Sequence, residues 1–205
     1  MHNHGVAYLG LKVGRLADSI EEGINYYKLA LEVTTQEVDP EKWAEMVHEL
    51  GVAYRNRKTG RIADNIEGVI SYPKRALKVF TQEADPEKWA KIVHRLGVAY
   101  SDREVGRRAD NIEESIGYFD LALEARTRDS DPEKWACTAY LLGIAYGDRT
   151  VGRKEINVEQ SIRYFRMALE VYTEQAYPEE WTAVMDRLRS AQAERARGRG
   201  SCLLS

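Results

Sequence analysis

Residues 85–130 read DPEKWAKIVHRLGVAYSDREVGRRADNIEESIGYFDLALEARTRDS, and this stretch decides the fold. Asp85-Pro86-Glu87 is typical of a helix start, because aspartate caps free N–H groups, proline suits the first turn, and glutamate favours the positive end of the helix dipole. Apolar residues then recur at helical spacing, namely Trp89, Val93, Leu96 and Tyr100. The first half of the stretch therefore predicts one helix.

The second half of the stretch predicts another helix. Gly106 lies in the connection between the two predicted helices, where it acts as a helix breaker. The helix is expected to begin at Asp110 or Asn111, because each has a glutamate three residues later, which is the spacing of a capping box. Its apolar stripe comprises Ile112, Ser115, Ile116, Phe119, Ala122 and Leu123. Since no segment alternates like a strand, the stretch indicates a pair of helices.

This helix pair recurs along the chain with a fixed period. The tryptophans lie 46 residues apart, at Trp43, Trp89, Trp135 and Trp181, and we expect all of them to be buried. Glycines keep the same step, and Gly97 lies inside a predicted helix, where glycine indicates close approach of a neighbouring helix. A fixed period means that one structural unit is stacked on itself, here about four and a half times.

The motifs of this unit resemble the tetratricopeptide repeat. Leu96-Gly97-Val98-Ala99-Tyr100 matches the family pattern on the first helix, and Ser115, Phe119 and Ala122 match it on the second. The period of 46 residues is longer than the family's value of about 34, and Trp89 lies one turn before the family's tryptophan position. The resemblance implies an all-α solenoid of antiparallel helix pairs that binds other proteins. The expected repeats lie near 1–38, 39–84, 85–130 and 131–176, followed by a terminal helix at 177–198 and a flexible tail at 199–205.

Composition excludes several classes of protein. The chain has 205 residues and a net charge of −3, with 43% hydrophobic and 31% charged residues. These values do not fit a membrane-embedded, disordered or nucleic-acid-binding chain. With two cysteines and no signal-peptide pattern, a reducing compartment fits best, and we expect a cytoplasmic protein.

No motif for catalysis, nucleotide binding or metal binding is present, so we expect neither enzyme activity nor a cofactor. His2, His48 and His94 share one register, with Tyr140 as its fourth member. A metal site would need ligands that converge on one ion. We interpret this register instead as a recurring contact with a partner.

The resemblance also implies which residues line a binding groove, because the first helix of each pair forms the concave surface in this family. The candidates for peptide contacts are His48, Arg55, Lys91, His94, Arg95, Val98, Tyr140, Leu141 and Ile144. They predict a peptide with an acidic segment against Lys91 and Arg95 and an apolar anchor against Tyr140 and Ile144. The alternative is an ordinary solvated face.

Both ends of the chain leave further hypotheses open. The N-terminus starts midway through a first helix, which suggests self-association through that edge or a regulatory fragment of a larger enzyme. The last four residues, Cys202-Leu203-Leu204-Ser205, form a prenylation pattern. A prenylated Cys202 would make the chain a membrane-anchored adaptor, and the other interpretation is an unmodified tail.

Two further features have alternative interpretations. The loop arginines recur in two ladders, Arg57, Arg103 and Arg149, and Arg15, Arg61, Arg107 and Arg153. They either pair with acidic residues of neighbouring repeats or form an edge for an anionic partner. Pro73 stands where other repeats carry an aromatic residue, and it is either a tolerated kink or a functional bend.

Overall fold

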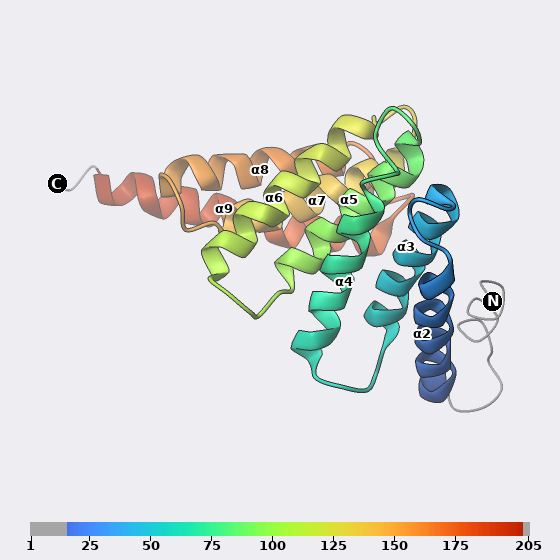
Figure 1. Ribbon diagram of the computed structural model, residues 1–205. Coiled ribbons are helices and arrows are strands. Elements are labelled where there is room, and N and C mark those ends of the chain that lie inside the picture. The colour runs from blue at the N-terminus through green and yellow to red at the C-terminus, as the bar shows by residue number, and fades with distance from the viewer. Residues whose placement is uncertain (1–15, 203–205) are drawn as a thin grey trace. The chain divides into compact units, whose positions relative to one another are not determined.

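The computed structural model describes residues 16–202 and the side chains of residues 18–198, and this part of the chain is helical with no strand (Figure 1). This confirms the all-α prediction. The helices are α2 (Leu16–Val33), α3 (Pro40–Asn56), α4 (Ile62–Ala76), α5 (Pro86–Ser101), α6 (Arg108–Ala125), α7 (Pro132–Asp148), α8 (Lys154–Leu169) and α9 (Pro178–Cys202). The last of them continues past residue 198, where we expected the repeat domain to end.

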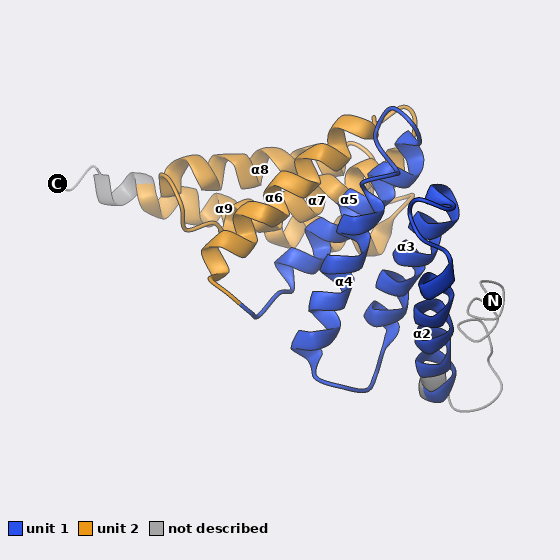
Figure 2. Cartoon of the chain, viewed as in Figure 1, with its two compact units in different colours: residues 1–105 blue, residues 106–205 orange. Residues whose placement is uncertain are grey.

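The chain divides into two compact units, one up to Val105 and one from Gly106 onward (Figure 2). In the first unit each helix packs against the next, from α2 through α3 and α4 to α5. In the second unit α6, α7, α8 and α9 follow the same order, and α7 also contacts α9. Each unit is therefore a row of helices in which sequence neighbours are packing partners.

The first helices of the repeats begin where the Asp-Pro motif predicted. Asp39, Asp85 and Asp131 are the N-caps of α3, α5 and α7, and proline follows each of them. Each carboxylate accepts a hydrogen bond from the backbone N–H three residues later, at 3.1, 2.9 and 3.3 Å respectively. This bond satisfies one of the N–H groups that a helix start leaves unpaired.

The predicted start of the second helices was wrong. Helix α6 begins at Arg108 rather than at Asp110 or Asn111, and its N-cap makes no side-chain hydrogen bond. The asparagine at the Asn111 position of the repeat hydrogen-bonds to carbonyl groups of the preceding loop instead of capping the helix. In other repeats, Asn65 Nδ2 donates to the carbonyl oxygen of Thr59, and Asn157 Nδ2 donates to that of Val151, both at 2.9 Å.

The glycines explain why the helices of a pair lie close together. A Cβ atom on Gly51 would lie 2.6 Å from Pro73 Cγ, and one on Gly143 would lie 2.5 Å from Phe165 Cδ1. These contacts confirm the predicted close approach. Pro73 is buried inside α4, so its ring fills the place that Phe165 takes in the second unit.

The turn glycines meet a different requirement. Gly60, Gly106 and Gly152 adopt φ angles of 76°, 84° and 81° in the loops that precede the second helices. This left-handed conformation strains residues with a side chain, whereas glycine adopts it freely. Gly106 therefore lies in the connection between the two helices of its repeat, as the sequence predicted.

The expectation of four buried tryptophans was wrong for three of them. Trp43 is buried, and the Arg75 guanidinium covers it at 5.3 Å from the ring centroid. Trp89, Trp135 and Trp181 are half-buried.

Each unit has its own apolar core. In the first unit a cluster of buried residues joins α2 to α3, and it comprises Ile20, Ile24, Tyr27, Ala30, Met46, Leu50 and Ala53. The core cluster of the second unit joins α7, α8 and α9, and its largest members are Ile162, Phe165, Tyr172 and Leu188. Among the described helices, none combines the length and the apolar character needed to cross a membrane.

Candidate functional site

The first arginine ladder pairs inside the chain. Each arginine forms a two-pronged ion pair with a glutamate 36 residues earlier, on the second helix of the preceding repeat. In the Arg57–Glu21 pair, Nε and Nη2 donate to the two carboxylate oxygens at 2.6 and 2.9 Å. The same geometry holds for the pairs Arg103–Glu67 and Arg149–Glu113. These arginines are internal clamps rather than an edge for an anionic partner.

A fourth clamp was missed from the sequence. Arg195 Nη1 lies 3.4 Å from Glu159 Oε2, again across 36 residues. Arg195 stands 46 residues after Arg149, so the repeat period alone would have found it.

The second ladder remains at the surface. Arg61, Arg107 and Arg153 are exposed and lie 3.9, 3.6 and 3.9 Å from an acidic residue in the first turn of the following helix. Ion pairs of this kind contribute little to stability. Arg15, the remaining member, lies outside the described residues.

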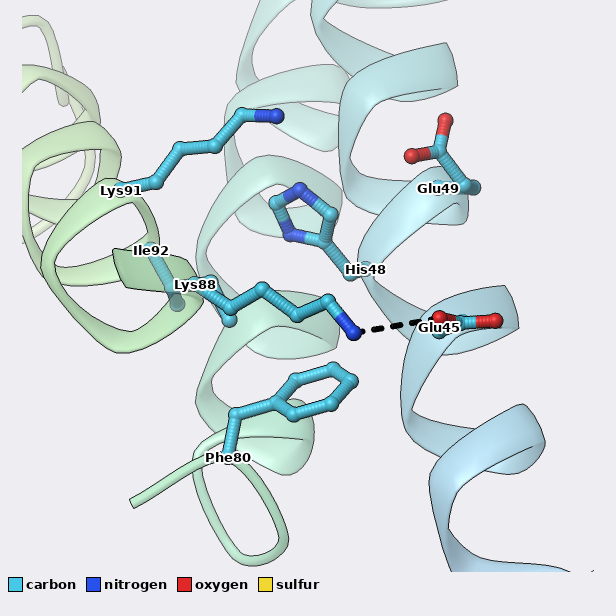
Figure 3. Close-up of a pocket in the computed structure, with 7 residues that line it drawn as sticks. All are labelled: Glu45, His48, Glu49, Phe80, Lys88, Lys91 and Ile92. Atoms are coloured by element: carbon cyan, nitrogen blue, oxygen red, sulfur yellow. Dashed lines mark hydrogen bonds and ion pairs between the residues drawn. The ribbon is translucent and has the colours of Figure 1, made fainter. Parts of the chain in front are cut away.

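A cavity of about 350 Å³ opens between α3 and α5 in the first unit (Figure 3). We call it the His48 cavity. Its lining comprises Glu45, His48 and Glu49 of α3, Lys88, Lys91 and Ile92 of α5, and Phe80 from the segment that precedes α5. His48 and Lys91 are the two predicted peptide contacts among these residues.

Lys88 connects the two helices across the His48 cavity. Its ammonium lies 3.2 Å from Glu45 Oε1, 3.4 Å from Asp85 Oδ2 and 4.7 Å from the centroid of the Phe80 ring. The sequence analysis did not select Lys88, because its partners come from other elements of the fold. Lys88 is therefore already neutralised by acidic neighbours.

His48 is held in its neutral form. Its Nε2 accepts a hydrogen bond from Arg95 Nη1 at 2.9 Å, which places the proton on Nδ1. Nδ1 is buried and has no hydrogen-bond partner among the described residues. Burial lowers the pKa of His48 to about 4, with further lowering by the charges of Arg95 and Lys91 and smaller effects of Arg55 and Lys88.

Both cations and carboxylates surround His48. The charges that lower its pKa are those of Arg95, Lys91, Arg55 and Lys88, and the cavity lining also contains Glu45 and Glu49. Lys91 is exposed and makes no ion pair within residues 18–198, whereas Lys88 is paired with Glu45. Figure 3 shows the His48 ring between the side chains of these two lysines. A carboxylate near Lys91 would offset the positive charge there.

A second cavity of about 350 Å³ adjoins the first. We call it the Ile62 cavity. It contains four of the predicted contacts, Arg55, His94, Arg95 and Val98, and the sequence analysis missed its apolar wall of Ile62, Ile66 and Val69 on α4. Because Arg95 lines this cavity and donates to His48, the hydrogen bond between them lies where the two cavities meet.

The remaining predicted contacts belong to the second unit. Tyr140, Leu141 and Ile144 are half-buried on α7. Tyr140 and Ile144 pack against the core cluster of that unit, and the Tyr140 ring lies 6.0 Å from that of Phe165. Much of the expected apolar anchor is thus engaged in packing inside its own unit.

The structure says less about the remaining hypotheses from the sequence, which concern metal binding, His2 and Cys202. The described residues contain no group of three or more histidine, cysteine or acidic side chains that could hold a metal ion. His2 and the side chain of Cys202 lie outside the described part of the chain.

Comparisons with known proteins identify no family, so a proposal about function has to rest on the fold and the two cavities. No protein-family model matches the chain, and no curated protein matches it significantly.

Proposed function

We propose that the chain is a non-enzymatic cytoplasmic scaffold that binds a segment of another protein. In this proposal the helix pairs are tetratricopeptide-like and antiparallel, and they stack as a solenoid. The support is the 46-residue repeat, the aspartate caps at the starts of α3, α5 and α7, and the glycine contacts within pairs. The binding face lies on α3 and α5 of the first unit.

The observation that carries the proposal is the exposed Lys91 at the His48 cavity. Lys91 is exposed and without an ion pair in the described part of the chain, and Arg95 lies on the same helix. An acidic peptide segment would supply the missing negative charge. Such charges mainly accelerate encounter and fix the register of the bound segment, whereas apolar contacts supply most of the affinity.

A peptide-library screen with salt dependence tests this function. Peptides with an acidic segment should be enriched, and Lys91→Glu should weaken their binding about tenfold at low salt. The loss should shrink at high salt, because screening weakens charge interactions. Lys58→Glu is the matched control, since Lys58 is an exposed lysine that lines neither cavity. Equal effects of the two reversals would contradict the proposed site.

A further inference from the structure

We propose that the Ile62 cavity receives one aliphatic side chain of the bound segment. The partner is then a peptide in which an aliphatic residue and a carboxylate lie about three residues apart. This inference rests on the proposed function and specifies the ligand of the same face.

The walls of the Ile62 cavity are suited to an aliphatic group. Ile62, Ile66 and Val69 of α4 line it together with Val98 of α5. Ile62 is 71% exposed although it is a large apolar residue. A bound aliphatic side chain would cover this surface and remove it from water, which is the main source of affinity for such a contact.

The helix geometry sets the spacing between the two groups. Lys91 and Val98 lie seven residues apart on α5, one at each cavity. Seven residues of α-helix span roughly 10 Å, at about 1.5 Å per residue. An extended peptide covers that distance in about three residues, at about 3.3 Å each.

Lys91, which is exposed and makes no ion pair in the described part of the chain, assigns the carboxylate to the His48 cavity. Lys91 lines the His48 cavity, whereas Arg95 lines the Ile62 cavity and donates a hydrogen bond to His48. The face therefore distinguishes the acidic end of a bound segment from its aliphatic end.

Synthetic peptides test this spacing by fluorescence anisotropy with the full chain. Leucine and aspartate are placed one, three or five residues apart, in both orders, in an otherwise neutral extended peptide. The separation of three should bind most tightly in at least one order. Replacing its leucine with alanine should weaken binding about tenfold, as expected for losing a buried aliphatic side chain.

A pair of variants assigns the leucine to the cavity. Ile62→Ser should remove most of the preference for leucine over alanine, while the effect of the aspartate persists. Val33→Ser is the control, because Val33 is similarly exposed and lines neither cavity. Thermal melts of both variants should match the parent, since both side chains lie at the surface.

The outcomes separate this inference from the proposed function. If peptides bind and Lys91→Glu weakens them, but neither the leucine nor Ile62→Ser changes the affinity, the aliphatic site is wrong and the function stands. A clear optimum at another separation also overturns the inference. If no peptide of the library or of this series binds, both the function and the inference are wrong.

Discussion

The two units use the same repeat positions for different purposes. In the first unit, His48 and Lys91 line an open cavity with exposed charge. The residues 92 positions later are Tyr140 and Ala183, and Tyr140 packs against the core of the second unit. Phe80 corresponds in the same way to Tyr172, whose hydroxyl donates to the carbonyl oxygen of Glu133 at 3.2 Å. A few side chains thus decide whether the same repeat positions line an open cavity or belong to a packed core.

The largest difference between the units is expected at the position of Pro73 and Phe165. Phe165→Ala should lower the free energy of unfolding by about 3–5 kcal/mol, because it removes a buried ring that contacts Gly143. Pro73→Ala also removes a buried ring, but it restores a helix-interior residue where proline costs about 3 kcal/mol. Its net effect should be about 1 kcal/mol or less.

Denaturant unfolding of both variants measures this contrast. A loss of more than about 2 kcal/mol for Pro73→Ala would show that the proline ring is as important for packing as the aromatic ring of the second unit.

The next effect concerns pH and is confined to the first unit. The pKa of His48 falls from 6.5 to about 4 on folding, so the unfolded chain binds the proton more tightly. The free energy of unfolding should therefore decline by up to about 3 kcal/mol as the pH falls from about 6.5 to about 4. At lower pH the contribution of His48 should not change further. The charged groups around the ring are Arg55, Lys88, Lys91, Arg95, Glu45 and Glu49.

Denaturant melts between pH 4 and pH 8 check this effect against His48→Gln. Glutamine keeps an acceptor for Arg95 and has no titrating group in this range, so the variant should lose part of the slope. An identical pH profile for both proteins would mean that the pKa of His48 does not change on folding.

The smallest effect should be shared by the two units. The Arg57–Glu21 and Arg149–Glu113 clamps have the same geometry, and each arginine holds the pKa of its glutamate below the usual value. Glu21→Gln and Glu113→Gln should each cost about 1 kcal/mol near pH 7, since the pairs are partly exposed. The difference in stability between each variant and the parent should vanish in acid. A carboxylate with a lowered pKa stabilises the fold only at pH values above that pKa, where it is ionised.

Stability measurements at pH 7 and pH 3 test whether the clamps are equivalent. A clear loss in one unit and none in the other would show that the clamps differ in strength despite their common geometry.

The sequence predicted what depends on local chemistry and periodicity. Asp85 caps its helix and Gly106 adopts a positive φ angle, because both properties belong to single residues and their immediate neighbours. The close approach at Gly143 was also predictable, since an unfavourable glycine that recurs inside a helix needs a packing reason.

Features that depend on tertiary neighbours were less accessible. Asn111 has a capping-box pattern, yet its counterparts Asn65 and Asn157 bind loop carbonyl groups. The apolar wall at Ile62 could not be found from the first helices alone, because α4 supplies it. Sequence reasoning selected His48 and Lys91 by register, but their enclosure in one cavity depends on how α3 packs near α5.

The most direct test of the binding face is an NMR titration of the His48 imidazole, with and without a peptide that contains leucine and aspartate three residues apart. In the free protein, burial and the nearby cations should hold its pKa near 4. A carboxylate bound beside Lys91 offsets those cations, so the pKa of His48 should rise in the complex while the Tyr140 resonances stay unchanged. A saturated complex in which the pKa of His48 is unchanged and the Tyr140 resonances shift would contradict the account.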